Sequence, residues 1–184
     1  MKNDPVIDYI LKSEGNLNVA AAVTDAWPKV TSKLVSAFLE RLGSRLKRKG
    51  WQSEPWGRPF LDQWAGFGMW KPAWSRSVSF QCGQYGNSMV IGVSRDTDDT
   101  EKLPLHGPLL SAVQKILPSA KPSPWWEACA SMPSPAPDWR KPEVLWRIHT
   151  DPKFLTDVAD QLFEIAEVSA PIIDELAKKR AKSR

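Results

Sequence analysis

The sequence predicts an α+β domain: a largely antiparallel sheet of four to five strands, covered by a long N-terminal and a long C-terminal helix. Three patterns indicate this fold. Apolar residues recur about every four positions over 25–49, two neighbouring segments between 77 and 93 alternate apolar with small residues, and a second helical repeat follows Pro152. Strands that follow one another closely pair antiparallel, and the helices then pack on one face of their sheet.

The composition indicates one globular domain. The chain has 184 residues, of which 42% are apolar, enough for a sizeable core. We expect 1–24 to be an N-terminal segment that can form a short helix ending at Gly15, and 25–184 to be a single α+β domain. The start is unlike a secretory signal, no apolar run is long enough to cross a bilayer, and Cys82 and Cys129 lack metal-site spacing. We therefore expect a cytoplasmic protein with no membrane, metal or cofactor partner.

The first long helix is expected over about 25–49. Thr24 or Asp25 can cap its N-terminus, and Pro28 suits its first turn, where a missing backbone N–H costs nothing. Its apolar residues fall on one face, and Gly50 provides the left-handed residue that commonly ends a helix.

The middle of the chain predicts three strands and a short helix. The Trp-, Gly- and Pro-rich stretch after Gly50 contains one expected strand at about 67–70. Two alternating segments, SVSFQC and SMVIGV, are separated by GQYGN and predict an antiparallel hairpin. The helical apolar spacing of GPLLSAVQKIL predicts a helix over 107–117.

The C-terminal part predicts two further strands and the long closing helix. WWEACASM is one expected strand, and the alternation of Val144, Trp146 and Ile148 predicts another. The closing helix should run over about 152–179, with a kink or an interruption at Pro171.

Tryptophans and basic clusters are the strongest indications of a binding role. The chain has ten tryptophans and a net charge of +4, and its basic residues gather at 41–49 and 178–184. Tryptophans in the core, and basic residues that complement helix dipoles, would explain part of this pattern. The alternative is a surface that contacts a protein partner or nucleic acid. The candidate contact residues are Arg41, Arg45, Arg48, Lys49, Trp51 and Trp56.

A second candidate site spells the signature of the PD-(D/E)xK nucleases. Asp138 follows a proline, and Asp151 and Lys153 have the spacing of the second carboxylate and the lysine, after the expected strand at 144–148. Such a site would bind Mg²⁺ through the carboxylates and activate water. However, Asp151 followed by Pro152 is also a typical helix start, and we favour that interpretation.

Over 38–179 the chain resembles the C-terminal accessory domain of bacterial and phage proteins of the PD-(D/E)xK nuclease family. The resembling segments are AFLERLGSRLKRKGW, WKPAW, MVIGVSRD, WWEACASMP, the isolated Trp139 and DQLFEIAEVSAPIIDEL. In that family the nuclease motifs lie in a separate N-terminal domain, which we expect to be absent here. The resemblance implies a binding role in phage defence or counter-defence, and it carries no catalytic residue across.

We therefore expect a non-enzymatic binding module that engages a protein partner or nucleic acid. Two alternatives stay open. The first is a metal-dependent nuclease that uses Asp138, Asp151 and Lys153 with Mg²⁺. The second is a structural subunit that buries its tryptophans against copies of itself, which would make the protein a homo-oligomer.

Overall fold

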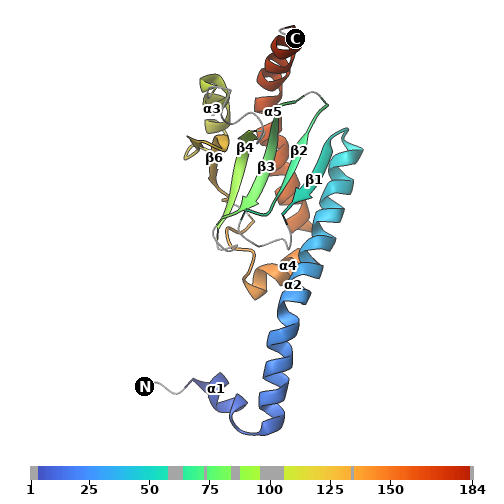
Figure 1. Cartoon of the computed structure of the whole chain (residues 1–184), viewed down its shortest axis with the longest axis vertical. Helices are drawn as coiled ribbons and strands as arrows, with labels where there is room; N and C mark the ends of the chain where they lie inside the picture. Colours follow the sequence, from blue (N-terminus) through green and yellow to red (C-terminus); the bar gives the residue numbers. More distant parts are fainter. Residues whose placement is uncertain are drawn as a thin grey trace.

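The computed structural model confirms the α+β class (Figure 1). It describes residues 4–57, 64–72, 74–83, 88–95, 106–133 and 135–182. Within these residues, six strands form one antiparallel sheet in the order β1-β2-β3-β4-β6-β5. The strands are β1 (Gln52–Trp56), β2 (Gly66–Trp70), β3 (Arg76–Cys82), β4 (Met89–Arg95), β5 (Lys121–Ser123) and β6 (Trp126–Ser131). The two edge strands, β1 and β5, were not predicted. Each contains a proline, which weakens the strand pattern but is tolerated at a sheet edge.

The helices are α1 (Pro5–Ile10), α2 (Glu14–Arg48), α3 (Gly107–Gln114), α4 (Pro142–Thr150) and α5 (Pro152–Lys182). Helix α2 begins well before the predicted start at 25. The Ser13 hydroxyl caps it by accepting from the Asn16 N–H at 3.1 Å, and the alanines that follow favour helix. Gly15 and Pro28 therefore lie inside α2, and Pro28 removes one backbone hydrogen bond without ending it. Helix α5 likewise continues through Pro171.

The core lies between one face of the sheet and helices α2, α4 and α5. The predicted hairpin is confirmed: β3 and β4 pair along their whole length and bury their apolar residues on the helix side. Trp139, in the loop before α4, lies at the centre of this core and is fully buried. Its ring centroid is 5.3 Å from those of Phe38 and Phe80 and 5.5 Å from that of Phe154. One tryptophan thus joins α2, the sheet and α5.

The predicted strand at 144–148 is wrong, because this segment is helix α4. Its buried residues are Val144, Leu145 and Ile148, which share one face at helical spacing. The alternating pattern would also have buried Trp146, whose surface is 65% exposed. Pro142 occupies the start of the helix, where a proline is favoured. In a stretch this short, the helical and strand spacings overlap.

No described helix covers the other face of the sheet, which we call the open face (Figure 1). Figure 1 shows α5 behind the strands and α2 beside β1, with the opposite face of β1–β4 turned to the viewer. On this face β2, β3 and β4 carry mostly glycine and serine, with Gln81 and Val90 at one end, where a solvated sheet usually carries long polar residues throughout. This combination of an uncovered face and small side chains forms the candidate site.

Candidate functional site

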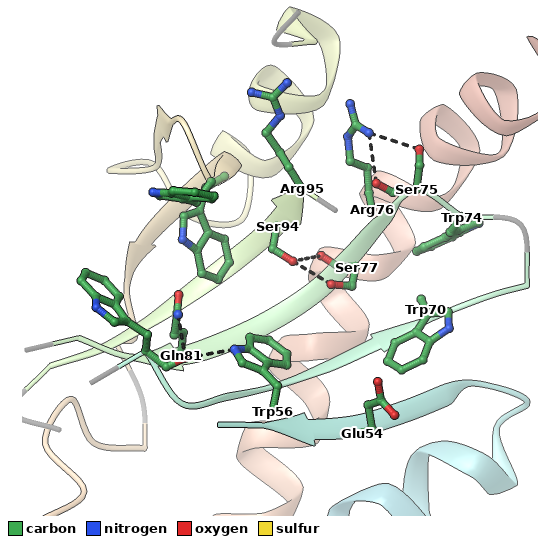
Figure 2. Close-up of a pocket in the computed structure, with 13 residues that line it drawn as sticks. Glu54, Trp56, Trp70, Trp74, Ser75, Arg76, Ser77, Gln81, Ser94 and Arg95 are labelled. Atoms are coloured by element: carbon green, nitrogen blue, oxygen red, sulfur yellow. Dashed lines mark hydrogen bonds between the residues drawn. The ribbon is translucent and has the colours of Figure 1, made fainter. Parts of the chain in front are cut away.

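A pocket of about 830 Å³ lies on the open face of the sheet (Figure 2). Its lining comes from β1 to β4, from the segments before β2 and β3, and from the β5–β6 turn with the start of β6. Tryptophans form most of its walls. They are Trp56, Trp64, Trp70, Trp74, Trp125 and Trp126. Six of the ten tryptophans in the chain thus line one concave site.

Two glycines of β2 allow Trp56 to lie flat against the sheet. A Cβ at Gly66 would collide with ring atoms of Trp56, and a Cβ at Gly68 would come within 2.9 Å of its Cζ3 atom. The Trp56 indole N–H donates to the carbonyl of Trp64 at 3.0 Å, and the Gln81 amide donates to the same oxygen at 2.8 Å. The ring of Trp56 is therefore fixed by contacts below it and by a hydrogen bond at its edge.

Trp64 has φ 70°, in the left-handed region that few residues other than glycine adopt. Its backbone N–H donates to the carbonyl of Cys82 at 3.1 Å, and its own carbonyl accepts the two hydrogen bonds described above. The chain thus holds Trp64 in a costly conformation at the pocket rim, a kind of backbone strain that concentrates at binding sites.

Three serine hydroxyls make a polar patch at the centre of the open face. Ser77 Oγ lies 2.8 Å from Ser79 Oγ and 2.7 Å from Ser94 Oγ, and Ser79 and Ser94 are 3.0 Å apart. Each hydroxyl can donate one hydrogen bond and accept two, so the cluster can reorient to suit a ligand.

Two arginines at one end of the pocket share a buried carboxylate. Arg76 donates through Nε to Glu127 Oε1 at 2.8 Å, and its Nη2 lies at the same distance from that oxygen. Arg95 Nε lies 3.7 Å from Glu127 Oε1, while Oε2 accepts from the His106 N–H at 2.8 Å. The side chains of Arg76, Arg95 and Glu127 are 3%, 5% and 0% exposed. Pairing is required at such burial, and it reduces the charge that these arginines offer a ligand.

The predicted contact residues do not form one site. Arg41 donates to the carbonyl of Ile148 at 2.8 Å, Arg45 lies 3.7 Å from Asp160, and Arg48 donates to Ser44 of its own helix. These arginines therefore stabilise α2 and its contacts with α4 and α5.

Lys49 and Trp51 line a different hollow, where the α2–β1 connection and Lys71, just after β2, meet the acidic side of α5. Trp51 packs edge-on against Trp74, with ring centroids 5.3 Å apart, and Lys71 lies over both rings. Of the six predicted contact residues, only Trp56 lies in the large pocket.

The nuclease residues lie at helix starts and turns. The Asp151 carboxylate accepts from the Lys153 N–H at 2.9 Å, as a cap of α5 does, and Lys153 Nζ pairs with Asp157 at 2.7 Å. Asp138 accepts from the Arg140 N–H at 3.0 Å. Because 144–148 is helical, Asp151 and Lys153 do not lie two residues apart on one strand, which the nuclease arrangement requires.

Neither cysteine is arranged as a metal ligand or a nucleophile. Cys82 is buried and its thiol donates to the Met89 sulfur at 3.7 Å, while burial raises the pKa of the Cys129 thiol above its ordinary value. Among the described residues, no cluster of three or more His, Cys, Asp or Glu side chains could hold a metal ion.

Sequence reasoning missed this pocket because it did not assign the tryptophans to a face of the sheet. The signal lay in GFGMW, where Gly66, Gly68 and Trp70 occupy alternate positions, and in the serines that alternate with the apolar residues of β3. Small residues on the outer face of central strands leave room for tryptophans at the edges, and this pattern could have indicated a pocket.

Within the described parts of the chain, every helix is too short or too polar to cross a membrane. Comparison with protein-family models, with curated proteins and with solved structures found no match to this chain.

Proposed function

We propose that the protein is a non-enzymatic binding module that engages a partner protein through the pocket on the open face of its sheet. The observation that carries this proposal is the pocket itself, which six tryptophans line together with Ser75, Ser77 and Ser94. Tryptophan and arginine are the residue types that most often dominate the free energy of protein–protein binding, particularly where they surround a pocket that a partner side chain fills.

The charges around the pocket favour a protein over a nucleic acid. Arg76 and Arg95 both pair with Glu127, and Glu54 adds an exposed carboxylate to the lining. Nucleic acid would bring phosphates, which need unpaired cations nearby. The basic residues at 41–49 do not supply them to this pocket, since their arginines contact α2, α4 and α5.

The test is capture of a partner with two matched tryptophan variants. Trp125 lines the pocket and Trp146 lies on α4 outside it, and their exposures are similar, at 58% and 65%. Trp125→Ala should abolish capture of a specific protein from a lysate of the source cells, whereas Trp146→Ala should retain it. Removing one such contact typically weakens binding by about 2 kcal/mol or more, roughly thirtyfold. Equal capture by both variants would contradict the proposal.

A parallel titration separates the nucleic-acid alternative. Labelled single- and double-stranded nucleic acid is titrated with the protein at low and moderate salt, and fluorescence anisotropy is measured. We expect no binding that depends on Trp125. Tight binding that weakens steeply with salt and is lost in Trp125→Ala would instead place a nucleic acid in the pocket.

The cellular setting of this binding role stays a prediction. The resemblance over 38–179 supports a module used in phage defence or counter-defence. A cytoplasmic location is a separate prediction, made from the N-terminal sequence and the spacing of the two cysteines. The nuclease alternative lacks its strand, because 144–148 lies in helix α4.

A further inference from the structure

We propose that the pocket receives a cationic side chain, an arginine or a lysine, from the partner protein, at a subsite formed by Glu54, Trp56 and Trp70. This inference rests on the proposed function and specifies the chemistry of the partner. It comes from the position of one carboxylate among the tryptophans.

The pairing of β1 with β2 places the three side chains together on the open face. Glu54 is directly opposite Gly68, Trp56 is opposite Gly66, and Trp70 is opposite Gln52. Because Gly68 has no side chain, the ring of Trp56 can lie over it, across from Glu54. Trp70 lies two residues from Gly68 along β2, on the same face. Figure 2 shows the Glu54 carboxylate next to Trp70, with Trp56 farther along β1.

Glu54 is the charge in this pocket that lacks a counterion among the described residues. It is exposed, and no described basic side chain forms an ion pair with it, whereas both lining arginines pair with Glu127. A cation over a tryptophan face is attracted by the ring, and a carboxylate beside the same ring adds direct charge attraction. An anionic ligand at this position would be repelled.

The molecule already uses this chemistry once, for a residue of its own. Lys71 Nζ lies 5.3 Å from the ring centroid of Trp51 and 5.6 Å from that of Trp74, and Asp174 Oδ2 is 3.7 Å away. The Trp74 indole N–H also donates to Asp174 Oδ1 at 2.6 Å. Two tryptophans and a carboxylate thus hold a lysine there. Glu54, Trp56 and Trp70 present the same three groups with no described cation.

The experiment compares a cationic probe with a neutral one of nearly the same shape. N-acetyl-arginine amide and N-acetyl-citrulline amide are titrated into the full chain, with N-acetyl-lysine amide as a third probe, and binding is followed by amide chemical-shift changes. We expect the arginine and lysine probes to bind the wild type and the citrulline probe to bind at least about fivefold more weakly. Glu54→Gln should weaken the arginine probe by about five- to tenfold and leave the citrulline probe unchanged.

Glu143→Gln is the matched control, because Glu143 is an exposed carboxylate on α4, outside the pocket. It should bind all three probes as the wild type does. The proposal is overturned if the arginine probe fails to bind, if citrulline binds equally well, or if Glu54→Gln binds arginine as tightly as the wild type.

The same variants separate this inference from the proposed function. Partner capture that is lost in Trp125→Ala but unchanged in Glu54→Gln would keep the binding module and refute the cation subsite. Capture that is lost in both would support both. Arginine binding that depends on Glu54, with no capture that depends on Trp125, would keep the subsite and refute the protein-binding function.

Discussion

Glu127 is the residue on which the arginine end of the pocket depends. Its carboxylate pairs with Arg76 and Arg95 and accepts from the His106 N–H, and all three charged side chains are buried. Glu127→Gln keeps the shape but removes the carboxylate charge that both buried arginines pair with. We expect the free energy of unfolding to fall by about 3–5 kcal/mol, measured by urea denaturation. Glu143→Gln, an exposed change, should stay within about 0.5 kcal/mol of the wild type.

A loss of less than about 1 kcal/mol in Glu127→Gln would show that the arginines find other partners or water, and that the buried group is not essential to the fold. The sequence could not predict this group. Arg76, Arg95 and Glu127 are far apart along the chain, and each lies at or next to the end of its strand. Only the pairing of β4 with both β3 and β6 brings them together.

The Cys129 thiol gives a second prediction at this scale. Burial raises its pKa in the folded protein above the ordinary value of 9.0, because the thiolate is poorly solvated there. Alkylation by iodoacetamide should therefore be slower in the folded protein than in urea at the same pH. At pH values well below 9.0 the Cys129 thiol is protonated in both the folded and the unfolded protein, so its ionisation does not change the free energy of unfolding. As the pH rises through 9.0 toward the folded pKa, the unfolded thiol ionises first, and the free energy of unfolding falls.

Cys129→Ser provides the control, since it leaves the buried Cys82 as the remaining thiol and should remove the part of the alkylation that belongs to Cys129. Equal alkylation rates in the folded and the unfolded wild type would contradict the raised pKa.

Among the elements, strand β2 sets the depth of the pocket. A Cβ at Gly68 would lie 2.9 Å from Trp56 Cζ3 and 3.0 Å from Ser79 Oγ, both tighter than ordinary contact. Gly68→Ala should therefore lift the Trp56 ring from the sheet. We expect at least fivefold weaker binding of the arginine probe, roughly 1 kcal/mol, and a shifted indole N–H resonance of Trp56. Gly107→Ala, where a Cβ would meet nothing within 4 Å, should change neither.

The elements also show how far the sequence patterns could predict this fold. Strict alternation was sufficient for the β3–β4 hairpin, and helical apolar spacing was sufficient for α3 and for the closing helix α5. For the segment at 144–148, spacing was not sufficient. The residues 144–148 satisfy both the strand and the helix spacing, and packing of Val144, Leu145 and Ile148 in the core selects the helix. The pocket depends on six tryptophans from several elements, so its location follows from strand order, which local patterns do not determine.

For the whole molecule, the main feature beyond the core is an arm made of α1 and the first half of α2. Figure 1 shows this arm extending away from the sheet and the other helices. Within α2 the buried residues begin at Val35 and end at Leu46. The arm nevertheless exposes large apolar side chains. They are Val6, Ile7, Tyr9, Leu11, Leu17, Val19, Val23, Trp27 and Val30. A surface of this kind favours the alternative in which the protein associates with itself.

Removal of the arm tests both its independence and this alternative. A chain that begins at Thr31 keeps every buried residue of α2, so its free energy of unfolding should stay within about 1 kcal/mol of that of the full chain.

Static light scattering across concentrations then measures the mass of both chains. If the arm mediates self-association, the full chain should exceed the 20.7 kDa of one copy, whereas the shortened chain should match its own monomer mass. A monomeric full chain would refute self-association, and a large loss of stability in the shortened chain would show that the arm is part of the folding unit. The pocket lies on the sheet, and no residue of the arm lines it. The buried residues of α2, Val35 to Leu46, remain in the shortened chain. The shortened chain should therefore also bind the arginine probe as the full chain does.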